Sequence, residues 1–450
     1  MPSFLRRLRG TWTLARLVRG QARYPFRPLE RILEDQSANV RRMAAYAYEN
    51  VPIYREAMDR AGLAPADFRT ADDLSRLPLL ERESYQRVPE KMTSRLYRPD
   101  RGLALTSAGS AGMPTTVHHD FRDLFLSAAL SERFRSIIGA LAGTGRRFRE
   151  ARLLHPDSLA HDMTDWHRAN TLLPANFPVR RIVISMFNPP DDTLRRLAAF
   201  RPDVVAGYGS FLEGFLAPID PAKRPAGLPR VVVYGADAMS AAGRKRISED
   251  LGISVLSNYH AAEASRIGFE CERHRGIHVN VDIHPLRIID PDGRTLPPGE
   301  PGQVVVSNLS CRGTVTLNYR LGDIAAWIPG PCPCGRNLPV LSFPEGRKED
   351  VLRLPSGKRT QARAVISFLD GEAGVWGYQV VQEARDRLRA RLATAPGTDL
   401  QKLKAEVLAH FSERLEEAMA VDVDFVTSIE RTRAGKHRTF LSAIAAAENP

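Results

Sequence analysis

Hydrophobic and polar residues follow a helical period through the first hundred residues. In the stretch LERILEDQSANVRRMAAYAYENV, residues 29–51, apolar positions recur three or four apart, and the pattern stops before Pro52. This spacing predicts an amphipathic helix that ends near the proline, because the residue before a proline disfavours helical backbone. Shorter helical patterns follow at 57–61 and 72–74. We therefore predict that residues 1–100 form a mostly helical opening region.

The pattern changes to that of strands further along the chain. Short β-rich runs occur at 180–187, 202–209, 230–236 and 253–259, separated by segments long enough for helices. This alternation predicts an α/β domain with a largely parallel sheet, in which ligands gather at the carboxyl ends of the strands.

The last third of the chain carries a second group of strands and then a separate pattern. Apolar runs at 302–309 and 315–328 follow the turn-forming stretch PDGRTLPPGEPG. A charged helical pattern, a strand and a basic loop occupy residues 399–440. This change in the residue pattern predicts two domains, a large one over residues 1–346 and a small one over residues 347–450.

The composition is that of a globular protein. Of 450 residues, 43% are hydrophobic and 26% are charged, which is ordinary for a chain with a packed core. No window approaches the roughly 20 apolar residues that a membrane-spanning helix needs. Arginines interrupt the apolar positions at the start of the chain, so we expect no export signal. The presence of only four cysteines favours a reducing, cytoplasmic setting.

Much of the net charge of +12 lies at the start of the chain, where no acidic residue precedes Glu30. Basic amphipathic segments are drawn to anionic surfaces, so a membrane-surface helix or a nucleic-acid contact is one interpretation. No zinc-finger, homeodomain or RNA-recognition pattern accompanies the charge, and we expect no nucleic-acid partner. The interpretation that we favour is a helix packing its apolar residues onto the body of the protein. These residues are Phe4, Leu5, Leu8, Trp12 and Ala15.

Cysteines and histidines recur with spacings that suit a metal ion. Cys271 and His274 form a Cys-x-x-His pair, His278 follows, and Cys332 and Cys334 flank a proline. Three thiolates and one imidazole would complete a tetrahedral zinc site, and such a closed set serves structure because no position remains for water or substrate. The spacing is also compatible with unlinked surface residues, and it does not decide between His274 and His278.

Small residues are concentrated in the stretch SAGSAGMPT, which follows the apolar run GLAL. Backbone N–H groups near Gly109 and Gly112 can approach an anion closely, and the hydroxyls of Ser107, Ser110 and Thr115 add donors. The stretch does not match the P-loop motif Gly-x-x-x-x-Gly-Lys-Ser/Thr. Its residues alone are compatible with a phosphate-binding loop and with a flexible linker.

Six motifs in order favour one protein family. SAGSAGMPT is followed by YGADAM, NYHAAEAS, YRLGD, EGRKEDVL and RAGKHR. In order and approximate spacing they resemble the motifs of adenylate-forming acyl-activating enzymes, and more narrowly the phenylacetate–CoA ligase-like branch. The opening region and the segment CPCGRNLP are similar to that branch as well, so the resemblance extends over roughly residues 30–445.

This resemblance implies both a fold and an activity. The fold would be α/β, with a large adenylate-forming domain of helical start and mixed sheets, and a small α+β carboxyl-terminal domain. The activity would be ATP-dependent conversion of a small carboxylic acid, an aryl or arylacetic acid being favoured, into an acyl-adenylate and then transfer to coenzyme A. Transfer to an amine or to a carrier protein is the alternative acceptor chemistry. A homodimer is the default expectation for assembly.

The resemblance also assigns roles to single residues. Lys436 in RAGKHR would supply positive charge where the carboxylate meets the α-phosphate. Glu263 would hold Mg²⁺ against the triphosphate, since a carboxylate is a hard oxygen ligand. Tyr259 would lie near the adenine, Asp323 would accept the ribose hydroxyls, and Arg347 would contact the nucleotide.

Further assignments concern the adenine, the phosphates and the metal. Gly235, Ala236 and Asp237 occupy the position that the family places beside adenine, and SAGSAGMPT becomes the loop that holds the phosphates. Asp350 would lie at or beside the hinge of the small domain. The resemblance also favours zinc, with His278 preferred to His274 as the histidine ligand. The cysteine ligands would be Cys271, Cys332 and Cys334, which leaves Cys311 an ordinary buried thiol.

Departures from the family pattern cluster at the nucleotide site. Met113 stands where lysine is common, Ala111 where threonine is usual, and Ala262 where a hydroxyl is expected before the glutamate. His260 replaces a glycine. These differences motivate a second class of function, a noncatalytic nucleotide- or acyl-binding protein.

Overall fold

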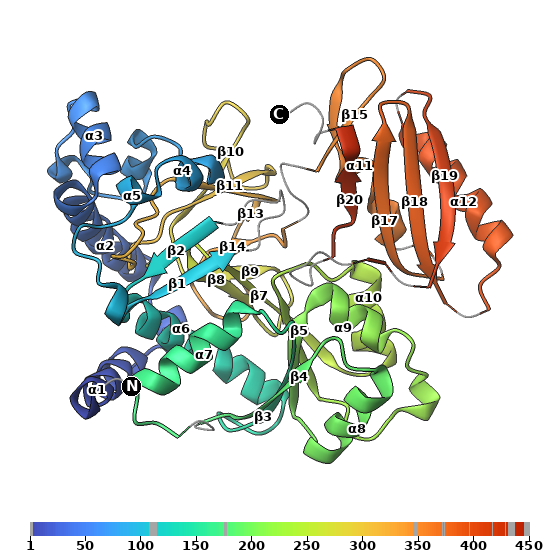
Figure 1. The fold of residues 1–450 in the computed structure, drawn as a ribbon, viewed down its shortest axis with the longest axis horizontal. Coiled ribbons are helices and arrows are strands. Elements are labelled where there is room, and N and C mark those ends of the chain that lie inside the picture. Colours follow the sequence, from blue (N-terminus) through green and yellow to red (C-terminus); the bar gives the residue numbers. More distant parts are fainter. Residues whose placement is uncertain are drawn as a thin grey trace. The chain divides into compact units, whose positions relative to one another are not determined.

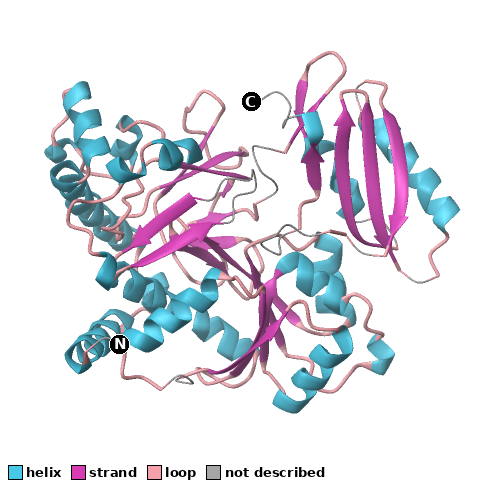
Figure 2. Ribbon diagram, viewed as in Figure 1, coloured by secondary structure: helices cyan, strands magenta, loops and turns pink. Residues whose placement is uncertain are grey.

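The structure is a computed structural model, drawn in Figures 1 and 2. It describes residues 3–107, 115–174, 178–344, 350–370, 372, 374–395, 397–415, 417–427, 429–430 and 437–444. The chain forms two compact units. The first unit comprises Met1–Glu150, Asp157–Arg181 and Leu256–Pro344, and the second comprises Ala151–Pro156, Ile182–Val255 and Glu345–Pro450.

This division differs from the predicted one in a specific way. The last segment of the second unit begins at Glu345, beside the boundary predicted at residue 346. The same unit also contains Ile182–Val255, which the sequence assigned to the large domain. The functional division into domains 1–346 and 347–450 therefore stays a prediction.

The first unit opens with helices, as predicted (Figure 2). Helix α2 ends at Asn50 because Val51, before Pro52, adopts an extended conformation. Helix α3 ends at Gly62, which takes the left-handed conformation with φ of 63°. The helices of this unit are α1 (Phe4–Val18), α2 (Leu29–Asn50), α3 (Pro52–Ala61), α4 (Arg82–Arg87), α5 (Pro89–Met92), α6 (Phe121–Leu141) and α7 (Leu159–Asn170).

The predicted orientation of α1 is wrong. Phe4, Leu5, Leu8 and Trp12 are 67%, 74%, 47% and 63% exposed, and Ala15 is exposed as well. The face that contacts the protein instead carries Gly10, Leu14 and Leu17. A side chain at position 10 would lie 2.0 Å from the backbone oxygen of Asn170, so glycine permits the close approach of α1 to the end of α7 (Figure 1).

Antiparallel strands complete the first unit. β1 and β2 form a hairpin whose last pair is Ser107 with Thr115. A second sheet has the order β10-β11-β12, and further strands neighbour one another in the order β13-β14-β9-β8-β7. The strands are β1 (Leu103–Ser107), β2 (Thr115–His119), β7 (Ser254–Ala261), β8 (Ser265–Glu270), β9 (Ile277–Val279), β10 (Leu286–Ile289), β11 (Gly302–Val306), β12 (Tyr319–Ala325), β13 (Trp327–Ile328) and β14 (Val340–Leu341).

The second unit begins with the α/β pattern that the sequence predicts. Its strands have the order β6-β5-β3-β4, and β5 and β6 are parallel. Most of the interior residues are aliphatic, including Val205, Val232 and Leu212. The elements are β3 (Arg149–Leu154), β4 (Arg180–Ser185), α8 (Pro190–Phe200), β5 (Val204–Tyr208), α9 (Gly209–Leu216), β6 (Val231–Gly235), α10 (Ala241–Lys245) and a π-helical turn at Arg246–Asp250.

The carboxyl-terminal segment has its own core. A four-stranded sheet has the order β19-β18-β17-β20, seen in orange and red in Figure 1. Helix α12 contributes Leu403, Val407 and Phe411 to its hydrophobic cluster. The elements are β15 (Val351–Arg353), β16 (Arg359–Gln361), α11 (Ala362–Ile366), β17 (Val375–Ala384), β18 (Arg387–Thr394), α12 (Leu400–Arg414), β19 (Ala420–Val426) and β20 (Phe440–Ser442).

The predicted α/β class is confirmed, with a helical start, mixed sheets and a smaller α+β carboxyl-terminal region. Within the described ranges, none of the helices combines the length and the apolar character needed to cross a membrane.

Candidate nucleotide site and metal centre

Glu263 lies in the tight turn that joins β7 to β8. The hydroxyl of Tyr319 donates to its carboxylate at 3.1 Å, and the side-chain amide of Asn308 donates to its backbone carbonyl at 3.3 Å. Tyr319 is 3% exposed, and burial together with the charge of Glu263 raises its pKa. The tyrosine is therefore a neutral hydrogen-bond donor that orients the carboxylate.

Asp323 lies in β12, which also begins with Tyr319. The strand bulges between Arg320 and Ile324 relative to β11, and Gly322 there has φ of 89°. A bulge of this kind re-aims a side chain away from the regular alternation. The hydroxyl of Tyr259, on β7, donates to Asp323 at 2.7 Å. Two of the predicted nucleotide-binding residues are thus brought together from positions 64 apart in sequence.

His119 fixes the turn that carries Glu263, a role that the sequence reasoning missed. It ends β2, and its Nε2 lies 2.8 Å from the carbonyl oxygen of Ala262. Its Nδ1 lies 2.6 Å from Asp123, at the start of α6. Burial lowers the pKa of His119, but the hydrogen bond and charge of Asp123 outweigh burial and hold the pKa above its ordinary value. The only available signal was a histidine four residues before an aspartate.

The same network reaches Asn308. The hydroxyl of Ser310 contacts the carboxylate of Asp123 and lies 2.8 Å from Oδ1 of Asn308. That oxygen also accepts from the backbone of Ser310 at 3.0 Å and of Cys311 at 3.2 Å. Asn308 is consequently held with its amide toward Glu263. A buried, mutually satisfied set of polar groups of this kind is rigid.

The predicted phosphate loop lies between the two strands of the β1–β2 hairpin in sequence. Gly109, Ser110 and Gly112 lie outside the described residues, as do Ala111 and Met113. Their flanking residues, Ser107 and Thr115, are paired in the β1–β2 hairpin. Thr115 is 2% exposed, and its hydroxyl has no hydrogen-bond partner in the part of the chain that the structure describes. A buried hydroxyl without a partner is unfavourable, which makes Thr115 a suitable donor to a bound anion.

The second unit holds the turn after β6. Gly235 ends the strand, Ala236 has the uncommon φ of 68°, and Asp237 follows. The carboxylate of Asp237 accepts from the backbone of Ser210 at 3.2 Å and from that of His437 at 3.3 Å. The turn predicted to lie beside adenine is therefore hydrogen-bonded to the start of α9 and to His437, the residue after Lys436.

Two predicted site residues, Lys436 and Arg347, lie outside the described residues. Their neighbours are described. Arg438 and Asp350 form an ion pair at 2.8 Å, in which both side chains are mostly buried. Arg438, two residues after Lys436, is thus paired with the residue predicted at the hinge.

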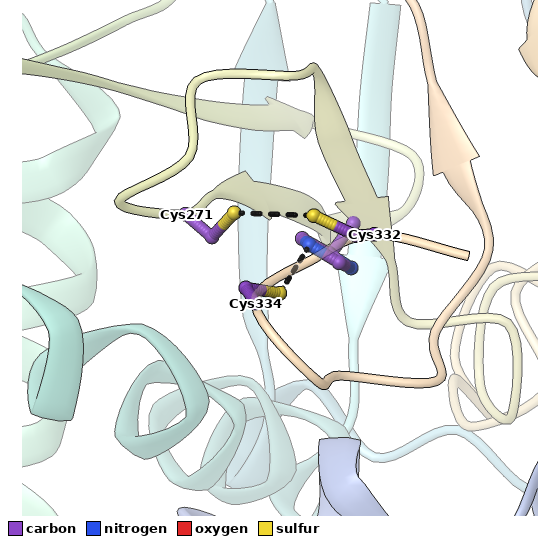
Figure 3. A group of neighbouring side chains, drawn as sticks. Cys271, Cys332 and Cys334 are labelled. Carbon is purple, nitrogen blue, oxygen red and sulfur yellow. Dashed lines mark hydrogen bonds between the residues drawn. The ribbon is translucent and has the colours of Figure 1, made fainter.

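The cysteines and histidine predicted to bind zinc form a compact group. The ligand atoms of Cys271, His278, Cys332 and Cys334 all lie within 4.8 Å of one another. Figure 3 shows the three labelled sulfur atoms turned toward a common centre. Sγ of Cys271 lies 3.7 Å from that of Cys332, and Sγ of Cys334 lies 3.3 Å from Nε2 of His278.

The surroundings of this group suit a metal ion. Nδ1 of His278 lies 3.0 Å from the carbonyl of Leu338, which places the proton on Nδ1 and leaves Nε2 for coordination. Burial lowers the pKa of His278 to about 4, so the imidazole is neutral. Burial raises the pKa of Cys271, so its thiolate is unfavourable unless a cation stabilises it. Burial also acts on Cys334, but hydrogen bonds from Arg336 outweigh it and lower the pKa of that thiol.

His274 is not part of the group. Its Nδ1 lies 2.7 Å from a carboxylate oxygen of Glu270, and its side chain is 46% exposed. The backbone at His274 has φ of 52°, at the turn that directs the chain into β9. The structure therefore favours His278, which the sequence spacing had left undecided.

Known proteins resemble this chain in sequence over most of its length. The phenylacetate–coenzyme A ligase of Thermus thermophilus is 27% identical over 363 residues, which cover 75% of this chain and 76% of that protein. The enzyme of the same name from Escherichia coli is 26% identical and covers 68% and 69%. No family model matches the chain.

Solved structures share the fold. A 2-hydroxyisobutyryl-CoA ligase in complex with an acyl-AMP superposes with a TM-score of 0.71 at 18% identity, covering 90% of this chain and 88% of that one. The amide bond synthetase of Marinactinospora thermotolerans gives a TM-score of 0.53 at 17% identity, with coverage of 89% and 92%. In sequence the chain is thus similar to phenylacetate–coenzyme A ligases, and in fold it is similar to a solved acyl-CoA ligase.

Proposed function

We propose that the protein activates a carboxylic acid with ATP and transfers the acyl group to coenzyme A. A carboxylate oxygen attacks the α-phosphorus, the bond to the β-phosphate breaks, and pyrophosphate leaves. The coenzyme A sulfur then attacks the acyl carbon, the bond to AMP breaks, and the thiol proton goes to solvent. The observation that carries the proposal is the match to four phenylacetate–coenzyme A ligases over 68–75% of the chain.

The described residues fit the nucleotide half of this reaction. Asp323 would accept the ribose hydroxyls, with Tyr259 holding its second oxygen. Glu263 would hold Mg²⁺ on the triphosphate, and the turn that presents it is fixed by His119 and Asn308. Bound Mg²⁺ would neutralise part of the phosphate charge. Lys436 and Arg347 would add positive charge at the reacting centre and the nucleotide.

The acid and the acceptor follow from the relatives. Their names specify phenylacetate and coenzyme A, so an aryl or arylacetic acid is the proposed substrate and coenzyme A the proposed acceptor. An amine acceptor is less favoured, because the amide bond synthetase resembles this chain at the level of fold alone.

We assign the cysteine–histidine group a structural zinc ion. Three sulfurs and one imidazole fill tetrahedral zinc and leave no position for substrate. Cys271 and His278 lie in the β8–β9 region, and Cys332 and Cys334 lie in the segment before β14. The ion would therefore crosslink these two parts of the chain.

Pyrophosphate exchange tests the proposal most directly. The full chain is incubated with Mg·ATP, labelled pyrophosphate and single acids from an aryl, arylacetic and aliphatic panel, without an acceptor. We expect exchange with aryl or arylacetic acids and a loss on the order of a hundredfold or more in Lys436→Ala. Lys402→Ala is the matched control, since Lys402 is exposed on α12 and should leave exchange unchanged. Coenzyme A and simple amines are then compared as acceptors.

One result would contradict the proposed reaction, and another would contradict the role given to Lys436. Absence of exchange with every acid would favour a noncatalytic nucleotide- or acyl-binding protein. Exchange that survives undiminished in Lys436→Ala would remove Lys436 from the reaction.

A further inference from the structure

Helix α1 leaves an apolar face uncovered. Phe4, Leu8 and Trp12 recur at intervals of four residues, and Leu5 lies beside them, so these side chains share one side of the helix. All of them are exposed. Large apolar side chains gathered on one exposed face mark an interaction surface, whereas isolated ones are ordinary.

The helix is nevertheless anchored to the protein by its opposite side. Leu14 and Leu17 pack into a cluster with Leu124, Phe125 and Trp166. Arg7 donates to the backbone oxygen of Thr171 at 2.9 Å, and Gly10 allows the contact with α7 described above. Figure 1 shows α1 lying alongside α6 and α7. The exposed face is therefore a fixed feature of a docked helix.

Arginines border the exposed apolar face. Arg9, Arg16 and Arg19 are exposed, and none of them takes part in an ion pair with another described residue. The guanidinium of Arg16 lies over the ring of Trp12, 5.6 Å from its centroid. Since no acidic residue precedes Glu30, the surface combines apolar side chains with uncompensated positive charge.

Acidic residues on the helices packed against α1 do not cancel this charge. On α6, Asp123 and Glu132 are buried. On α7, Asp165 pairs with Arg168 at 3.4 Å, and Asp162 adds a single exposed carboxylate. The balance at α1 remains positive.

We propose that α1 docks the protein onto a membrane surface that carries anionic lipids. Phe4, Leu5, Leu8 and Trp12 insert at the boundary between headgroups and acyl chains, and the arginines contact lipid phosphates. An apolar face with tryptophan and phenylalanine, bordered by arginine, is the composition of helices that lie in this interface. The helix lies on the membrane and does not cross it. The inference is independent of the proposed catalysis, because it uses no residue of the nucleotide site.

Vesicle binding tests the proposal with the full chain. Sedimentation is measured with vesicles of phosphatidylcholine alone and of phosphatidylcholine with phosphatidylglycerol. We expect binding to the anionic vesicles that weakens as salt is raised. Arg9→Glu/Arg16→Glu should lower the partition coefficient by about twentyfold or more, and Leu5→Ser/Leu8→Ser by on the order of tenfold.

Matched control variants distinguish an effect of the α1 surface from the effect of changing any exposed leucine or arginine. Leu96→Ser changes a leucine that is comparably exposed elsewhere, and Arg101→Glu changes an exposed arginine. Both should bind vesicles as the unaltered protein does, and circular dichroism should show that all variants are folded.

Four outcomes would overturn the proposal. One is absence of binding to anionic vesicles, and another is equal binding by the α1 variants and their controls. A third is a concentration-dependent dimer, in analytical ultracentrifugation, that is lost in Leu5→Ser/Leu8→Ser while vesicle binding is unaffected. That last result would assign the face to a second copy of the chain. Binding of duplex DNA in place of vesicles, lost in Arg9→Glu/Arg16→Glu, would equally reject the membrane assignment.

Discussion

At the scale of single residues, the hydroxyl of Tyr319 is the group whose removal is easiest to interpret. It donates to Glu263 at 3.1 Å, and its ring packs edge-on against Tyr85 with centroids 5.0 Å apart. Tyr319→Phe keeps the ring and removes the bond to a charged acceptor. We expect pyrophosphate exchange to fall on the order of tenfold, the effect of losing a hydrogen bond to a carboxylate.

Tyr85→Phe is the matched control for this variant. Tyr85 is also buried, but its hydroxyl pairs with Thr316 at 2.6 Å and not with Glu263. Both variants should lower the melting temperature by a similar few degrees, roughly the effect of losing one buried hydrogen bond. Only Tyr319→Phe should slow exchange. Equal exchange rates in the two variants would show that Tyr319 does not position Glu263.

The His119–Asp123 pair predicts a pH dependence of stability. The pKa of His119 is raised in the folded protein, so its stabilising contribution is complete below the unfolded-state pKa near 6.5 and is lost as pH rises through the folded-state pKa. The pKa of Asp123 is lowered, so this carboxylate changes the pH dependence of stability only in acid, where it becomes protonated. We therefore expect the difference in free energy of unfolding between the unaltered protein and His119→Gln to be largest near pH 6 and to shrink toward pH 9.

Urea denaturation at a series of pH values measures this difference. Comparing the two proteins removes the contribution of other buried histidines, such as His167 and His284, whose pKa values burial lowers to about 4. Those histidines favour the folded state as pH rises. A difference that is constant over the whole range would show that His119 is neutral in the folded protein.

At the scale of elements, the cysteine–histidine group predicts metal content. We expect about one zinc ion per chain in the purified protein, the number that one tetrahedral site holds. Cys334→Ser and His278→Gln should lose the metal, while Cys311→Ser and His274→Gln should keep it. Cys311 is buried away from the group, and His274 pairs with Glu270. Metal analysis by mass spectrometry distinguishes the four variants, and a stoichiometry well below one in the unaltered protein would reject the site.

Removing the metal should also loosen the strands that it joins. β9 pairs with β14, and the pair Val340 and His278 includes one of the four ligands. We expect a chelator to lower the melting temperature by several degrees or more, because a structural ion contributes folding free energy directly. An unchanged melting temperature after complete zinc removal would mean that the ion does not stabilise the fold.

Elements with a clear period were predicted well. The helix over residues 29–51 and the helix in 399–419 correspond to α2 and α12, since an apolar stripe at helical spacing must be buried against something. For α1, the same rule predicted that the wrong face of the helix packs onto the protein. That helix has apolar residues on two sides, and periodicity does not say which side meets the protein. Gly10 decides the matter through its closeness to α7, a long-range contact that composition does not reveal.

The residues of the candidate site were identified by motif order more than by local pattern. Tyr259 with Asp323 and Cys271 with Cys332 meet only through the strand arrangement. His119 was missed because its role depends on the fold of the β7–β8 turn around the carbonyl of Ala262. Spacing could not distinguish His274 from His278, because the turn before β9 determines which histidine faces the cysteines.

At the scale of the whole molecule, Asp350 is the residue predicted to lie at the hinge of the small domain. Arg438 lies two residues after Lys436 and pairs with Asp350. If the small domain turns about Asp350, adenylation and thioester formation require different backbone angles at this position. The two half-reactions should then respond differently to a substitution that restricts the backbone there.

Asp350→Pro tests this expectation, because proline fixes φ near −65°. We expect pyrophosphate exchange within about threefold of the unaltered protein and thioester formation lowered by on the order of tenfold or more, since one conformation is retained and the other is impeded. Asp350→Ala is the control, which removes the pair with Arg438 but leaves the backbone free. It should affect the two half-reactions equally. A parallel loss of both in Asp350→Pro, with a circular dichroism spectrum like that of the unaltered protein, would place the hinge elsewhere.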